Sequence, residues 1–161
     1  SRVLGDVYKR QGIMDALSEA NVPVSNVRQI DYHTVFGSPV PSTSSYKSYE
    51  ELFFPVDYTA VIGFNDLQSY SAMEILKERG YRIPEDISLI SFDHLRKTHT
   101  YLPPLTSIAD NTDKSIADTA VSILLDKIKN SDSKFTGAVL PVTIYDGHTT
   151  GPVNKAFETS F

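Results

Sequence analysis

A chain of 161 residues, of which 40% are hydrophobic and 22% charged, is large and apolar enough to bury the core of one ordinary globular domain. Its formal net charge of −5 argues against a basic face that grips phosphates, so this stretch is not expected to bind DNA by itself. It has no cysteine for a disulfide or a thiolate metal site, and no apolar run of the roughly 18 residues that a membrane helix needs.

The N-terminal third is predicted to hold two helices with a strand and a loop between them. Residues 12–20 follow a helical period, and Asn21 and Pro23 stop the helix. Residues 27–32 are predicted to form a strand, residues 37–45 are rich in Pro and Ser as surface loops are, and residues 46–54 return to a helical pattern. The side chains expected to face inward are Ile13, Ala16, Leu17 and Ala20 in the first helix and Tyr49, Leu52 and Phe53 in the second.

The central stretch is predicted to be a strand, a helix and a second strand. Residues 59–64 are almost wholly apolar, as expected of a parallel strand that is covered on both faces. Asn65 or Asp66 can cap the helix that follows, Gly80 suits its C-terminal end, and residues 87–92 supply the second strand. The buried stripe of this helix is predicted to contain Ala72, Ile75, Leu76 and Arg79.

Polar residues follow both of these strands. A strand-helix-strand crossover is right-handed in nearly every case, so the two strands are parallel neighbours and carry Asn65 and Asp93 to the same edge of one sheet. Open parallel sheets bind ligands at this edge, which predicts a small-molecule site. The plainer alternative is that Asn65 or Asp66 caps a helix and that Asp93 closes a turn.

The C-terminal part is predicted to add a strand, a long helix and a last strand. Residues 105–109 form the first of these, and Thr112 or Asp113 can cap a helix that reaches about Asn130. Residues 138–145 contain a proline, which places their strand near a sheet edge. The long helix has a broad apolar stripe of Ile116, Ala120, Val121, Ile123, Leu124, Leu125 and Ile128.

The order and spacing of these pieces resemble the C-terminal part of the effector-binding domain of the LacI/GalR (lactose-repressor/galactose-repressor) transcription regulators. The motifs that carry the resemblance are Asn65-Asp66 after a strand, Gly80 after a helix, Ile-Pro-Glu-Asp-Ile-Ser at 83–88, Phe92-Asp93 after a strand, and Tyr-Leu-Pro-Pro-Leu-Thr-Ser-Ile at 101–108. The resemblance runs from about residue 11 to residue 150. It implies a doubly wound, mostly parallel α/β sheet of the periplasmic-binding-protein type, with a sugar or related effector bound between two lobes and a separate DNA-binding headpiece.

The resemblance also implies a division of the chain. Residues 1–10 do not resemble the family and are expected to be a non-native leader, while residues 11–110 correspond to the C-terminal effector-binding lobe. Residues 111–130 correspond to a crossover helix of the N-terminal lobe, residues 131–150 to a return strand, and residues 151–161 to a tail. The chain is therefore expected to be a fragment, with the apolar stripe of its long helix exposed to water.

Ligand contacts at three strand ends follow from the resemblance. Asn65 and Asp93 would hydrogen-bond sugar hydroxyls, which both donate and accept, and Asp66 would remain a helix cap. Asp110 lies where the chain crosses between lobes, although an acid at the start of a helix is an equal alternative.

Contacts from the N-terminal part and a dimer interface follow in the same way. Lys9 stands near the place of a family arginine, and Phe36, with Tyr32 as the alternative, would stack on a sugar face. Residues 101–103, Tyr-Leu-Pro, correspond to a segment at the family's dimer interface, which implies a homodimer.

Neither a metal site nor catalysis is expected. His94 and His99 do not share one helical face with Asp93, and the chain has no nucleophile elbow, phosphate loop or dinucleotide fingerprint, so no cofactor is implied. The sequence thus favours a cytoplasmic, sugar-responsive regulator whose helix-turn-helix lies outside this chain. A periplasmic-type sugar-binding protein of a transport system is the first alternative, and a small α/β enzyme is the second.

Overall fold

The computed structural model describes residues 3–30, 52–95, 103–110, 115–130 and 137–154. Two compact units divide the chain, Ser1–Asp57 and Tyr58–Phe161, and each is described by itself.

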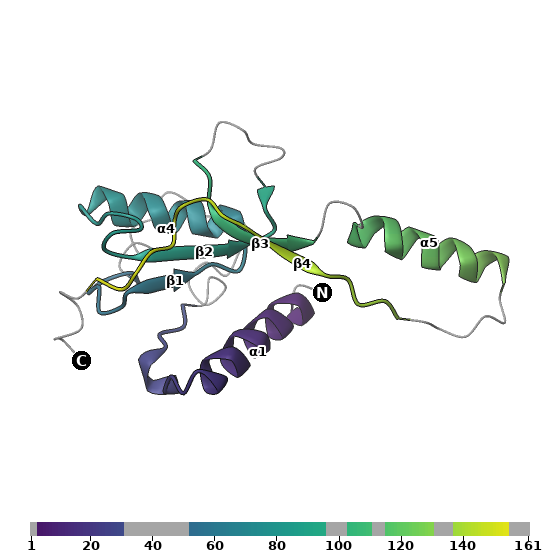
Figure 1. Ribbon diagram of the computed structural model, residues 1–161, viewed down its shortest axis with the longest axis horizontal. Coiled ribbons are helices and arrows are strands. Elements are labelled where there is room, and N and C mark those ends of the chain that lie inside the picture. Colours follow the sequence, from purple (N-terminus) through teal and green to yellow (C-terminus); the bar gives the residue numbers. More distant parts are fainter. Residues whose placement is uncertain (1–2, 31–51, 96–102, 111–114, 131–136, 155–161) are drawn as a thin grey trace. The chain divides into compact units, whose positions relative to one another are not determined.

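The first unit begins with helix α1, Val3–Glu19 (Figure 1). The prediction that the helix starts at residue 12 is wrong, because residues 3–10 hold one glycine and no proline and nothing in them stops a helix from extending. The predicted end is confirmed: Asn21 has a φ of 57°, and the N–H of Val22 donates to the carbonyl of Leu17 at 2.8 Å. Of the four side chains predicted to face inward, Ile13 and Leu17 are half-buried and Ala16 and Ala20 are exposed.

The rest of the first unit is less regular than expected. A 3-10 turn, η1 (Val24–Asn26), precedes residues 27–30. The prediction that these residues belong to a strand is wrong. The Arg28 guanidinium donates to the carbonyls of Phe53 and Pro55 at 3.2 and 3.1 Å, so a side chain rather than a strand ladder joins these two segments. Residues 52–53 form a turn and residue 54 has no regular structure, so these residues are not the end of a helix as predicted. Residues 31–32 and 46–51 lie outside the described residues.

The second unit is built on a four-stranded sheet in the order β1-β2-β3-β4. The strands are β1 (Ala60–Ile62), β2 (Ser88–Phe92), β3 (Thr106–Asp110) and β4 (Val142–Tyr145). The first three are parallel and β4 is antiparallel to β3, which confirms the mostly parallel sheet and the edge position of the last strand (Figure 1). Each element of the predicted crossover is present, although β1 is shorter than expected.

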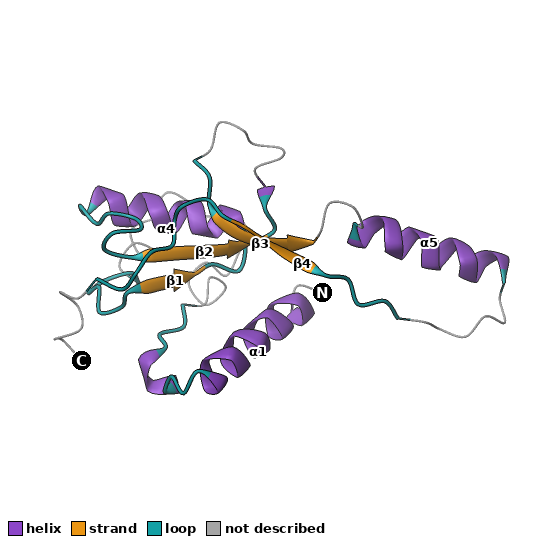
Figure 2. Ribbon diagram, viewed as in Figure 1, coloured by secondary structure: helices purple, strands orange, loops and turns teal. Residues whose placement is uncertain are grey.

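Helix α4, Asp66–Glu78, lies along one face of this sheet (Figure 2). Its stripe of Ala72, Ile75 and Leu76 is buried, as predicted, together with Leu89 of β2. Burial of each large side chain contributes about 1.5–3 kcal/mol, so this layer is the core of the second unit. Arg79, predicted to belong to the stripe, is exposed because the helix has already ended there.

Glycine ends α4 in the predicted manner. Gly80 has a φ of 87°, and the N–H of Tyr81 reaches back to the carbonyl of Leu76 at 3.0 Å. This left-handed ending satisfies carbonyl groups that the helix itself leaves without partners.

Helix α5, Ile116–Lys129, buries none of its side chains. Ser115 caps it by accepting from the N–H groups of Ala117 and Asp118, whereas the predicted caps Thr112 and Asp113 lie outside the described residues. Ile116, Val121, Leu124, Leu125 and Ile128 are between 48% and 70% exposed. The predicted exposure is confirmed for these five residues, whereas Ile123 of the same stripe is half-buried. The assignment of the helix to a second lobe stays a prediction.

A steric prediction follows from Gly147. A Cβ atom there would overlap main-chain atoms of Leu105, while a Cβ at Gly137 would meet no atom within 4 Å. We expect Gly147→Ala to destabilise the fold by about 1–3 kcal/mol, as overpacking does, and Gly137→Ala to be near neutral. Thermal unfolding followed by circular dichroism measures both, and equal melting temperatures for the two variants would contradict this packing.

Candidate functional site

Three parallel strands bring polar residues to one edge of the sheet. Because β1, β2 and β3 run in the same direction, their carboxyl ends lie together, and Asn65, Asp93 and Asp110 follow or end them. The predicted gathering of these residues at the carboxyl edge is therefore observed. Their part in ligand binding stays a prediction.

Asn65 is the N-cap of α4. Its Oδ1 accepts a hydrogen bond from the N–H of Gln68 at 2.9 Å, and its φ of −156° is the extended backbone that caps adopt. The plainer alternative considered for this residue is thus correct for its amide oxygen. A hydrogen bond to a ligand would come from the amide NH2 group, which the cap does not use.

Asp66 does not serve as the cap, which corrects the prediction. The residue is 2% exposed, and its two carboxylate oxygens bind two different segments. Oδ2 accepts from the N–H of Leu95 at 2.5 Å, and Oδ1 accepts from the hydroxyl of Ser107 at 2.8 Å. The carboxylate therefore ties the start of α4 to the turn after β2 and to β3.

The turn after β2 has an unusual backbone. Asp93 and His94 have φ values of 96° and 49°, a left-handed region that residues other than glycine seldom adopt. The N–H of Asp93 donates to the carbonyl of Ile108 at 2.9 Å, and that of His94 to the hydroxyl of Ser107 at 3.0 Å. Together with the N–H of Leu95, which donates to Asp66, all three successive N–H groups of residues 93–95 are hydrogen-bonded within the protein. Asp93 itself is exposed at the edge of the sheet.

Asp110 takes part in the start of the next helix. Its Oδ2 accepts from the N–H of Ile116 at 2.9 Å, which agrees with the helix-start alternative given for this residue. Its carbonyl accepts from the hydroxyl of Tyr145 at 3.3 Å. The Tyr145 ring in turn stacks on His94, with centroids 3.8 Å apart and planes inclined by 11°.

The remaining candidate residues belong to other parts of the chain. Lys9 lies on α1 in the first unit, and Phe36, Tyr101 and Leu102 lie outside the described residues. Pro103 is exposed, and its carbonyl accepts from the hydroxyl of Tyr70 at 2.8 Å. The ligand and dimer roles of these residues stay predictions.

Three buried serines escaped the sequence prediction. The hydroxyls of Ser69 and Ser91 lie 2.8 Å apart between α4 and β2, and Ser107 of β3 bonds Asp66. All three are fully buried. A polar side chain inside an apolar strand needs a partner, so Ser91 and Ser107 were the signal that could have revealed this network.

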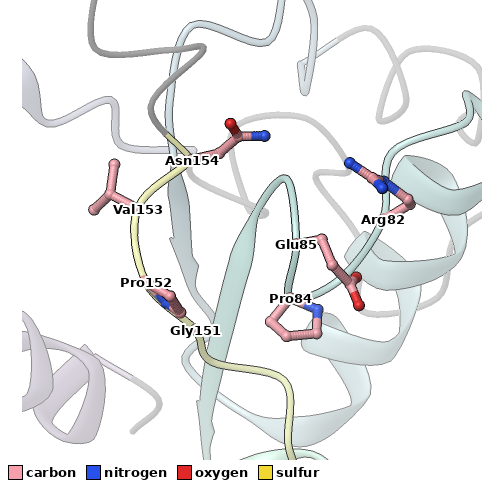
Figure 3. A pocket seen from close by; sticks show the side chains of 7 residues that line it. All are labelled: Arg82, Pro84, Glu85, Gly151, Pro152, Val153 and Asn154. Carbon is pink, nitrogen blue, oxygen red and sulfur yellow. The ribbon is translucent and has the colours of Figure 1, made fainter.

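A shallow groove of about 470 Å³ lies at the opposite end of β2 (Figure 3). Figure 3 shows Arg82, Pro84 and Glu85 on one side of it and residues 151–154 on the other. Asp86, the residue after Glu85, accepts from both the Arg82 side chain, at 2.7 and 2.9 Å, and the Arg82 N–H, at 2.9 Å. The guanidinium bonds first, and then the main-chain bond, hold the pKa of Asp86 well below its ordinary value of 3.8.

Within the described ranges no three His, Asp or Glu side chains are grouped so that they could hold a metal ion. In the same residues no helix has the length and apolar character needed to cross a membrane.

Asp86 predicts a pH dependence of stability. Because folding lowers its pKa, Asp86 stabilises the fold at pH values above 3.8, and this contribution is lost as the pH falls below that value. We expect Asp86→Asn to lower the melting temperature at about pH 6 and the difference from wild type to shrink toward about pH 2.5. Glu74→Gln, which removes an exposed carboxylate from α4, is the control for a general charge effect. A difference that is the same at both pH values would contradict the role given to the Arg82 contacts.

Comparison with known families gives one match over most of the chain. The family described as "Periplasmic binding protein-like domain" matches residues 9–150. This range is close to the 11–150 over which the sequence motifs resemble the LacI/GalR effector-binding domain.

Individual proteins support the same relationship. The chain is 37% identical over 120 residues to the HTH-type transcriptional repressor PurR of Aliivibrio salmonicida, an alignment that covers 74% of this chain and 34% of that protein. A LacI family transcriptional regulator from Enterococcus faecium, solved with bound ribose, aligns with a TM-score of 0.65 and 26% identity over 89% of this chain and 50% of its own. A LacI-type regulator from Bifidobacterium animalis subsp. lactis aligns with a TM-score of 0.68 and 25% identity, over 92% of this chain and 51% of that regulator's chain. The chain thus spans about a third of the curated relative and about half of the solved chains.

Proposed function

The chain belongs to the family of periplasmic-binding-protein-like domains, in the form found in LacI/GalR regulators, and we propose that it senses a small carbohydrate-like effector for such a regulator. The effector binds between two lobes, of which the second unit supplies part of one. Binding controls the attachment of a helix-turn-helix headpiece to DNA. The protein acts in the cytoplasm as a homodimer and uses no cofactor.

The observation that carries this proposal is the polar carboxyl edge of the sheet. It combines the exposed carboxylate-bearing Asp93 with the amide group of Asn65 at neighbouring strand ends. A carboxylate accepts and an amide NH2 donates, which suits sugar hydroxyls because each hydroxyl can do both. A neutral, polyhydroxylated ligand is the class that such an edge recognises best.

The relatives favour a regulator over the alternatives. Those reported above are named as transcriptional repressors or regulators, not as transport proteins or enzymes. The Enterococcus faecium regulator was solved with ribose, so D-ribose is the first probe to use, followed by a panel of other monosaccharides and disaccharides.

Two substitutions test the ligand contacts without disturbing the local backbone. Asp93→Gly removes the carboxylate while glycine keeps the left-handed conformation, and Asn65→Asp removes the amide NH2 while aspartate keeps the helix cap. We expect each to weaken sugar binding by about 1–3 kcal/mol, a tenfold or greater loss, in calorimetry on the complete protein.

The control is Glu74→Gln on the exposed side of α4, which should bind as wild type does. Without ligand, Asn65→Asp and Glu74→Gln should melt close to wild type, and Asp93→Gly should melt no lower, because glycine adopts the left-handed conformation without strain. Undiminished affinity in both Asp93→Gly and Asn65→Asp would place the ligand elsewhere.

The 161-residue chain by itself is expected to leave DNA unbound. Its net charge of −5 repels phosphates, and counterion release, the main source of DNA affinity, needs a cluster of lysines and arginines. In a mobility-shift assay at about 0.1 M salt we expect no retention of a duplex probe. Retention that weakens as salt rises would show that this chain carries a DNA-binding surface of its own.

A further inference from the structure

We propose that Asp66 and Ser107 form a positioning pair that fixes the turn of residues 93–95 and so holds Asp93 at the ligand edge. The part of the proposal that concerns ligand rests on the proposed function. The part that concerns the turn rests on contacts in the structure alone.

The burial of Asp66 requires a reason. At 2% exposure a carboxylate loses its water, which costs several kcal/mol unless donors replace the water. Both oxygens of Asp66 have such donors, the N–H of Leu95 on one and the hydroxyl of Ser107 on the other. The charge also lies at the first residue of α4, where the helix dipole favours an anion.

The turn needs to be held in place. Two successive residues other than glycine, Asp93 and His94, have positive φ angles, a strained conformation that persists only when its surroundings impose it. Of the three N–H groups from 93 to 95, the first bonds a strand carbonyl. The other two bond Ser107 and Asp66, so this pair accepts two of the three main-chain hydrogen bonds that residues 93–95 donate.

The pair acts on ligand through Asp93. Asp66 and Ser107 are buried, at 2% and 0% exposure, and neither carboxylate nor hydroxyl is available to a sugar. Asp93 is exposed next to the residues that they hold. Asp66 and Ser107 are therefore positioning residues, and Asp93 is the residue that meets the ligand.

The direct test observes the turn without ligand. In the complete protein labelled with 15N-leucine, the Leu95 amide proton should resonate far downfield because its bond to a carboxylate is short. Asp66→Asn keeps one acceptor and should move this resonance upfield, and it should raise amide hydrogen exchange at Leu95 about tenfold or more. Asp66→Ala should do both to a greater extent, while the amide of Leu89 in β2 exchanges as in wild type.

A second variant and a matched control keep this test decisive if Asp66→Ala does not fold. Ser107→Ala removes the hydroxyl that donates to Asp66 and should also speed exchange at Leu95. Asp86→Asn removes a carboxylate that likewise accepts a main-chain N–H, but at the opposite end of β2, and should leave Leu95 unchanged. An unaltered Leu95 amide in Asp66→Asn and Ser107→Ala, or an equal change in Asp86→Asn, would overturn the proposal.

A binding cycle with D-ribose separates positioning from a general loss of structure. Asp66→Asn should weaken D-ribose binding about fivefold or more in the wild-type background and change it little in Asp93→Gly, because its effect passes through Asp93. Equal losses in the two backgrounds would overturn the link to Asp93. If wild type fails to bind D-ribose or any sugar of the panel, the proposed function is contradicted, whereas the Leu95 amide still decides whether the pair holds the turn.

Discussion

The parallel alignment of β1, β2 and β3 is the constraint on which the rest of the second unit depends. It places the start of α4, the turn after β2 and the end of β3 at one edge, where each arrives with main-chain groups that need partners. The buried carboxylate of Asp66, at the start of α4, accepts from the main-chain N–H of Leu95 in the turn and from the side-chain hydroxyl of Ser107 in β3, so it joins all three segments. The same edge thus holds a buried network of hydrogen bonds and also presents the exposed side chain of Asp93.

Much of this arrangement follows from local sequence. The apolar run at 59–64, the stripe of α4 and the glycine at its end each have a local physical cause, so the crossover and its direction could be predicted. Which of Asn65 and Asp66 caps α4 could not be predicted in this way, since both residue types cap helices well. It is decided by Ser107, which lies 41 residues further along the chain and comes close only in the folded sheet.

In the first unit, local sequence predicted less of the structure. The predicted helix end at Asn21 is confirmed, because the left-handed conformation of an asparagine depends on the residue itself and its near neighbours. The prediction of a strand at 27–32 is wrong over its described residues, 27–30. The segment of residues 27–32 mixes apolar residues (Val27, Ile30 and Tyr32) with polar ones, and such a segment forms a strand only if another strand offers its edge. The Arg28 side chain holds the segment instead, through carbonyls about 25 residues away that no pattern in the run itself reveals.

The central claim is that the ligand lies at the carboxyl edge of this sheet. A crystal structure of the complete protein with its effector bound tests the claim most directly. The account predicts a ligand hydroxyl within hydrogen-bond distance of the Asp93 carboxylate, with the left-handed turn and its bond to Asp66 unchanged. An effector bound instead in the groove between Arg82 and residues 151–154, with water alone beside Asp93, would contradict it.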